Sequence, residues 1–100
     1  MAISFLEQRT LLKTGDFREL VIQAILTAAI AIRNEPESTE NHASRVALAS
    51  AVIMNPASME PKFSELLATQ MTSMEPSDAN ISNAVSAVWD AIALTMYPAA

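Results

Sequence analysis

The chain has 100 residues, a length that predicts a single domain over residues 1–100. Apolar residues make up 51% of the chain and charged residues 17%, which excludes an intrinsically disordered protein. The formal net charge of -5 disfavours direct binding to nucleic acid or to an anionic membrane, and the absence of cysteine excludes disulfides, thiolate metal sites and cysteine nucleophiles.

Two helices are predicted in the first third of the chain. Ser4 with Glu7 forms a capping-box pattern that opens a short helix, and Gly15, the single glycine, stands where that helix would end. The same pattern recurs at Asp16 and Glu19 and opens a second helix. Its apolar residues recur at helical spacing: Phe17, Leu20, Val21, Ala24, Ile25, Ala28 and Ile32. Because its other faces are also apolar, we expect this helix to be central and covered on several sides.

An acidic loop precedes the third predicted helix. The loop contains Pro36, and we expect Ser38 or Thr39 to cap the helix that follows. The predicted inward stripe of this helix is Ala43, Val46, Ala47, Ser50 and Ile53. The helix should end at Asn55, because the residue before a proline disfavours helical backbone angles.

Two more helices complete the predicted fold. Ser58 is expected to cap a fourth helix, with Pro61 tolerated in its first turn. Its apolar stripe is Phe63, Leu66, Leu67 and either Gln70 or Met71. Ser77 is expected to cap a fifth helix that Pro98 closes, with the stripe Ile81, Val85, Val88, Ile92 and Met96. The sequence therefore predicts an all-α fold, a compact bundle of about five helices.

The sequence contains no segment that predicts membrane insertion or export. The most apolar run, residues 20–32, is 13 residues long, shorter than the roughly 18 to 20 residues that span a bilayer. The amino-terminal segment lacks the basic and apolar regions of a secretory signal. We therefore expect no membrane contact and no secretion by a signal peptide.

Few residues in the chain could carry catalysis or bind a cofactor. The one histidine, His42, has no visible nucleophile to pair with, so we expect no catalytic residues and a protein that is not an enzyme. A single glycine cannot build a phosphate-binding loop, and we expect no cofactor and no small-molecule substrate. Glu35, Glu37 and Glu40 could gather around a divalent cation, but loop carboxylates without a converging scaffold are ordinarily solvated, and no metal site is predicted.

Three apolar residues are candidates for contact with another chain. Trp89 lies beside the apolar stripe of the fifth helix, which suits either the edge of the core or an interface. Met59 and Met74 fall in predicted loops or helix starts, where a methionine either packs beneath the loop or offers an adaptable contact surface.

The distribution of charge supports a contact surface of a second kind. Residues 1–33 carry a net charge of +1 and residues 34–100 a net charge of -6, and Glu35, Glu37 and Glu40 lie in the acidic part. This asymmetry could steer a basic partner or orient association between copies, although a simply solvated acidic face is the alternative. So few charges on so small a domain also favour interfaces buried between subunits.

Residues 41–93 contain a series of helical phrases: Asn41-His42-Ala43-Ser44-Arg45-Val46-Ala47-Leu48-Ala49, then Val52, Asn55-Pro56, Phe63, Leu67-Ala68-Thr69, Ser77-Asp78-Ala79-Asn80-Ile81, Val85 and Val88-Trp89-Asp90-Ala91-Ile92-Ala93. In these residues the segment resembles small all-helical structural proteins of tailed bacteriophages. The resemblance implies a virion or virion-assembly protein, at the neck between head and tail or among the minor capsid components.

Two functions are compatible with these observations. The first is a non-enzymatic structural subunit of a virion, assembled in the host cytoplasm, whose partners are other copies of itself or other virion proteins. The second is a small acidic helical module, otherwise cytoplasmic, that binds a basic protein surface or an amphipathic helix. Association that persists in high salt would favour the first, and association that weakens steeply with salt would favour the second.

Overall fold

The computed structural model describes residues 15–72, 74 and 77–98. These residues form four helices, α2 (Gly15–Arg33), α3 (His42–Met54), α4 (Pro56–Gln70) and α5 (Asp78–Met96), and they contain no strand. The all-α prediction is therefore confirmed. The short helix predicted to open at Ser4 lies outside the described residues. None of the described helices has the length and apolarity needed to cross a membrane.

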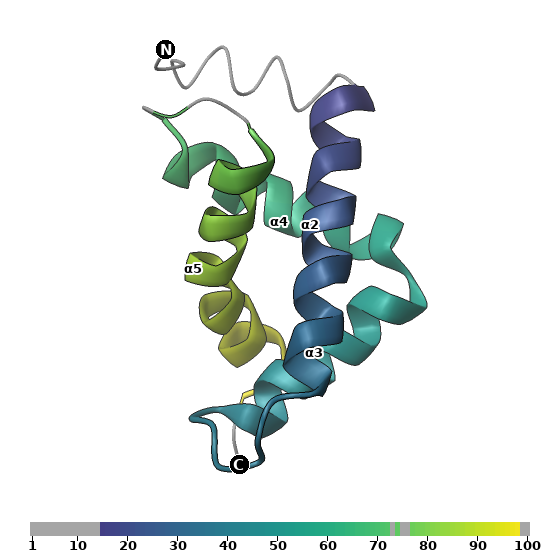
Figure 1. The fold of residues 1–100 in the computed structure, drawn as a ribbon, viewed down its shortest axis with the longest axis vertical. Helices are drawn as coiled ribbons and strands as arrows, with labels where there is room; N and C mark the ends of the chain where they lie inside the picture. Colours follow the sequence, from purple (N-terminus) through teal and green to yellow (C-terminus); the bar gives the residue numbers. More distant parts are fainter. Residues whose placement is uncertain (1–14, 73, 75–76, 99–100) are drawn as a thin grey trace.

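The helices form a compact bundle centred on α2. α2 and α5 lie side by side and run in the same direction, with α3 and α4 crossing behind them (Figure 1). α2 contacts all three other described helices, as predicted for a helix that is apolar on several faces. Its residues Val21 and Ile25 are fully buried, and they share the core with Leu48 of α3, Phe63 of α4 and Trp89 of α5.

Two of the helix starts are fixed by side-chain caps. The Ser77 hydroxyl accepts a hydrogen bond from the Asn80 backbone N–H at 3.2 Å, which confirms the predicted cap of α5. The fourth helix begins earlier than predicted, because Asn55 rather than Ser58 is its cap and accepts from the Ser58 backbone N–H. Pro56 occupies the first turn, where its fixed φ suits a helix start. Pro61 therefore lies inside α4 and not in its first turn.

The start of α3 also differs from the prediction. Neither Ser38 nor Thr39 caps it, because the loop continues through successive turns in which Thr39 N–H bonds to the Pro36 carbonyl and His42 N–H to the Thr39 carbonyl. Asn41 precedes the helix in the left-handed region, at φ 61°, and its side chain makes no capping bond. Asparagine tolerates this conformation better than most residues. The predicted end of the helix at Asn55 is confirmed.

α3 is rotated relative to its predicted orientation. Its buried residues are Ser44, Leu48, Ala49 and Val52, whereas Ala43 and Ser50 of the predicted inward stripe are exposed. The helix is apolar on both sides, so the spacing of apolar residues could not choose between them. Polar bonds decide the orientation: Ser44 donates to the Tyr97 carbonyl oxygen at 2.5 Å, and Arg45 reaches carboxylates on the loop and on α5.

The predicted stripes of α4 and α5 are largely correct. Phe63 and Leu67 of α4 and its C-cap Met71 are buried, but Leu66 and Gln70 are exposed. The inward face of α4 continues through Met59, Glu60, Ser64 and Ala68 instead. Ile81, Val85, Val88 and Ile92 of α5 are buried. Met96 is 36% exposed because α5 ends there, with Tyr97 as its C-cap.

Candidate interaction surfaces

An ion-pair cluster ties the α2–α3 loop to α3 and α5. Arg45 makes a bidentate ion pair with Glu35, in which Nε lies 2.8 Å from Oε1 and Nη2 lies 3.2 Å from Oε2. Its Nη1 donates a hydrogen bond to Asp90. The hydrogen bond to Glu35 raises the pKa of Arg45, against the opposing effect of burial, so the guanidinium stays charged. The indole Nε1 of Trp89 donates to the Arg45 carbonyl oxygen at 3.4 Å.

This cluster leaves the outer side of α3 without charge. Arg45 is the only lysine, arginine, aspartate or glutamate in α3, and its side chain is only 19% exposed because it points to the cluster. The opposite side consists of Ala43, Ala47, Ser50 and Met54, which we call the α3 face. Spacings of four, three and four residues place these side chains in one row along the helix.

The α3 face is open to solvent. Met54 is 85% exposed, Ala43 and Ser50 are exposed, and Ala47 is partly exposed. Val46 and Ile53 flank the row and are partly buried against the core. The face therefore presents an uncharged row about 16 Å long, from the helical rise over eleven residues, with a large side chain at one end and a small one at the other.

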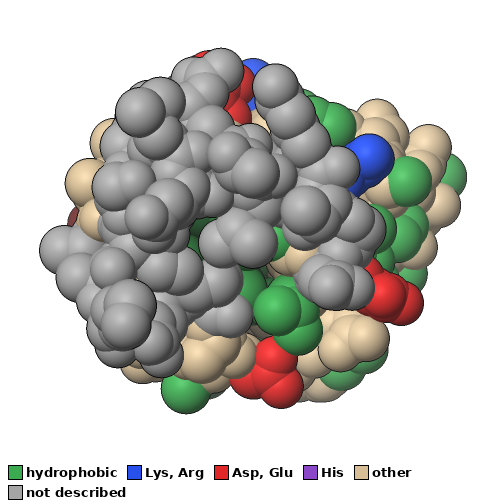
Figure 2. Space-filling view, turned by 90° about the horizontal axis from the view of Figure 1, so that it is seen from above, with side chains coloured by type: hydrophobic (Ala, Val, Ile, Leu, Met, Phe, Trp, Pro, Cys, Tyr) green, Lys and Arg blue, Asp and Glu red, His purple; other side chains and the backbone are tan. Residues whose placement is uncertain are grey.

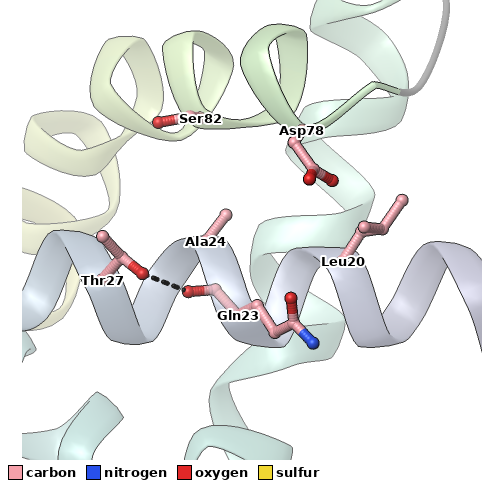
Figure 3. Close-up of a pocket in the computed structure, with 6 residues that line it drawn as sticks. All are labelled: Leu20, Gln23, Ala24, Thr27, Asp78 and Ser82. Carbon is pink, nitrogen blue, oxygen red and sulfur yellow. Dashed lines mark hydrogen bonds between the residues drawn. The ribbon is translucent and has the colours of Figure 1, made fainter.

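A shallow groove between α2 and α5 forms a second surface, here called the α2–α5 groove. One part has a volume of about 190 Å³ and is lined by Leu20, Gln23, Ala24 and Thr27 of α2 and by Asp78 and Ser82 of α5 (Figure 3). A further part, of about 210 Å³, is lined by Ala28, Ala31, Ile32, Glu35, Arg45, Ser86 and Trp89. Ala24 and Ser82 in the first part, and Ala28, Ala31 and Ser86 in the second, are the small side chains of the lining. The Asp78 carboxylate points into the space between the helices (Figure 3).

Other large apolar side chains reach the surface at separate points. Ile30 of α2 is 58% exposed, and Leu66, Leu94 and Met96 are each exposed by slightly more than a third. In the end-on view, the hydrophobic side chains of described residues stand among polar atoms and next to acidic groups (Figure 2). Isolated residues of this kind are common on protein surfaces, so they do not mark a site by themselves.

The structure separates the three apolar residues that the sequence offered as contact candidates. Trp89 is 1% exposed and Met59 is 7% exposed, so both belong to the core of this fold and neither presents a surface. The Trp89 ring packs against Phe63, with ring centroids 5.3 Å apart. Only Met74, at 36% exposure, remains at the surface.

The acidic candidates do not converge on one point. Glu35 is drawn into the ion-pair cluster, while Glu37 and Glu40 are exposed. His42 Nδ1 lies 3.7 Å from Glu35 Oε1, and this buried atom makes no hydrogen bond. Within residues 15–72, 74 and 77–98, no group of three or more acidic or histidine side chains is placed to hold a metal ion.

The sequence reasoning missed both the α3 face and the groove. A signal for the first was present: α3 has one charged residue and is apolar on two opposite sides, so one of those sides had to face outward. The groove depends on how α2 and α5 meet, which no local pattern encodes. Comparison of the chain with protein-family models, curated proteins and solved structures finds no match.

Proposed function

We propose that this chain is a non-enzymatic structural subunit of a larger protein assembly, and specifically a virion protein of a tailed bacteriophage, at the neck or among the minor capsid components. The observation that carries the assembly role is the α3 face, an uncharged row that ends in an 85% exposed methionine. The resemblance of residues 41–93 to phage structural proteins supplies the virion context. Its partners are other copies of itself or other virion proteins.

The placement of charge in the rest of the fold supports this role. Residues 20–32 of α2 contain no lysine, arginine, aspartate or glutamate, and α5 has only Asp78 and Asp90. The outer surfaces of three helices are therefore nearly uncharged over their middle turns. Surfaces depleted of charge are typical of the centres of protein interfaces, whereas a free-standing small domain needs charge to stay soluble.

The charged side chains with the least exposure serve the fold itself. Glu60 is 2% exposed and accepts hydrogen bonds from Arg18 Nε at 2.6 Å and from the Ser64 hydroxyl at 2.5 Å. Arg45 likewise joins α3 to the loop and to α5. Both clusters connect helices that are distant in sequence, which favours a role in holding a rigid subunit together.

Virion membership is tested by mass spectrometry of gradient-purified particles from cells that carry the gene. We expect the chain at a fixed copy number relative to the major capsid protein. Its absence from intact particles, with the chain abundant in the same lysate, would overturn the virion proposal. The assembly role is tested by light scattering behind size exclusion, with and without the co-purified neighbours, at low and high salt. We expect complexes that persist in high salt, because apolar contacts are not screened.

The α2–α5 groove favours one alternative function, a small acidic module that binds a helix. Asp78 lines one part of the groove, and in the other part the Glu35 carboxylate is paired with the guanidinium of Arg45, so the charged side chains that line the groove sum to -1. The probe is a synthetic amphipathic helical peptide with lysines along its polar face. Tight binding that falls steeply with salt and weakens on Asp78→Asn would support the module, and salt-independent binding would count against it.

A further inference from the structure

One carboxylate of the α2–α3 loop faces two basic side chains of α3. Glu35 accepts a hydrogen bond from Arg45 Nε at its oxygen Oε1, and the Nδ1 atom of His42 lies 3.7 Å from that same oxygen. Because positions 42 and 45 are three residues apart, the two side chains leave α3 on the same side. The carboxylate is therefore in reach of two cations, and the charge of one of them depends on pH.

The imidazole of His42 has an unused hydrogen-bonding atom. Among the residues that the structure describes, His42 Nδ1 is the one buried side-chain nitrogen or oxygen without a hydrogen bond. A buried polar atom without a partner is costly, and most such atoms in native proteins have one. In a neutral imidazole one nitrogen donates and the other accepts, whereas in the protonated ring both donate. Protonation therefore gives Nδ1 a hydrogen and a charge opposite Glu35, the one carboxylate within ion-pair distance of it in the described part of the chain.

We propose that protonation of His42 adds a second charged bond to Glu35 and thereby tightens the attachment of the α2–α3 loop to α3 in mild acid. At neutral pH the carboxylate is held by Arg45, and in acid it is held by Arg45 and His42 together. Histidine is the side chain whose charge changes between about pH 5 and pH 8, which sets the range of the switch. The proposal goes beyond the structural role and does not depend on it.

The charges around His42 favour this second cation. Glu35 of the loop and Asp90 of α5 carry two negative charges against the single positive charge of Arg45, so a charged imidazole brings the sum of the cluster from -1 to zero. Glu40, two residues before His42, is exposed and adds negative charge at this end of α3. The start of a helix opposes a cation, but its dipole corresponds to about half a charge there. The full charge of a carboxylate at contact distance outweighs it.

The contact fixes the sign of the pH effect. The protonated imidazole has a partner in the folded chain that it lacks in the unfolded one, so this contribution to stability is present in acid and is lost as the pH rises. The His42 side chain is 22% exposed and shares Glu35 with Arg45, which limits the effect. We expect a change of about three- to tenfold in the unfolding equilibrium constant, between the values for exposed ion pairs and for buried charged hydrogen bonds.

The test compares the full-length wild-type chain with His42→Gln by urea unfolding at about pH 5 and at about pH 8. Glutamine is neutral at both, and all other titrating groups are present in both chains, so the ratio of the two unfolding constants isolates the imidazole. We expect this ratio to favour the wild type by about three- to tenfold more in acid. His42→Asn replaces His42→Gln in the comparison if circular dichroism shows that the glutamine variant is unfolded.

Two control backgrounds separate the contact with Glu35 from other effects of acid. In a Glu35→Gln chain, the exchange of His42 for glutamine should change stability equally at both pH values, because the charged imidazole has lost its partner. In a Glu37→Gln chain, which lacks an exposed carboxylate of the same loop, the pH dependence should persist.

Two outcomes would overturn the proposal. One is a ratio of unfolding constants, for the wild type and His42→Gln, that is the same in acid as at about pH 8. The other is a pH dependence that Glu35→Gln leaves intact. Neither outcome would contradict the structural role, which is tested separately on purified particles.

Discussion

Replacing Arg45 with methionine should destabilise the fold, because one guanidinium holds three segments together. The substitution Arg45→Met keeps an unbranched side chain of similar helix propensity but removes every bond from the guanidinium to Glu35 and Asp90. Glu35, only 16% exposed, is then left without its bidentate partner. The outer surface of α3 is unaffected, so the change reports on the fold and not on self-association.

The structure sets the size of the expected effect. Arg45 and Glu35 are both less than one fifth exposed, and hydrogen bonds between charged groups at such sites contribute about 1.5 to 3 kcal/mol. The Asp90 side chain is 48% exposed, and a pair screened by that much solvent contributes about 0 to 1 kcal/mol. We therefore expect a loss of about 2 to 3 kcal/mol in the free energy of unfolding. For a domain of this size that corresponds to a fall of about 10 to 20 °C in Tm.

The measurement is urea and thermal unfolding at neutral pH and low protein concentration, followed by the fluorescence of Trp89, the single tryptophan. Because folding raises the pKa of Arg45, its contribution is fully present below its ordinary pKa and is lost only as the pH rises through the folded value, far above neutrality. Arg33→Met, at an exposed position of α2, is the control and should change stability by less than about 0.5 kcal/mol. A loss of that same small size for Arg45→Met would refute the structural role of the cluster.

Three further substitutions test other parts of the fold. Phe63→Ala should cost about 3 to 5 kcal/mol, because it opens a cavity beside Trp89 in the core, and calorimetry that finds less than 1.5 kcal/mol would contradict the packing. Ser77→Ala should cost about 1 kcal/mol in urea unfolding, because the Asn80 N–H loses its cap, whereas Ser77→Asp should restore it. Glu60→Gln should cost about 1 to 3 kcal/mol in the same assay, because the amide cannot accept from both Arg18 and the Ser64 hydroxyl as the carboxylate does; no change would contradict a stabilising role for these two hydrogen bonds.

The sequence predicted the parts of the fold that local physics determines. α5 shows this best, since the cap Ser77 and the stripe Ile81, Val85, Val88 and Ile92 are predicted and the structure has both, with only Met96 of the predicted stripe exposed. α3 shows the limit. A helix that is apolar on two sides gives no periodic signal for its rotation, and the deciding bonds of Arg45 reach ten residues back and 45 residues forward along the chain.

The candidate surfaces were less predictable than the fold. Trp89 and Met59 were candidates because aromatic and methionine side chains are frequent in interfaces, but the same properties make them good core residues, and the structure buries both. Met54 is not a contact candidate in the sequence, because it stands at the end of a predicted helix. Its exposure follows from the rotation of α3, which only the tertiary contacts fix.

The central position of α2 has a consequence for synthesis on the ribosome. α2 is covered by all three helices that follow it, and the last of these, α5, ends at Met96, some 63 residues after Arg33. At a translation rate of about 5 to 20 residues per second, the helix at the centre of the bundle emerges about 3 to 13 s before the last helix that buries it is complete. During those seconds the apolar residues of α2 lack their final covering. Correct folding of this small domain therefore depends on the synthesis of α5 before another chain binds to α2.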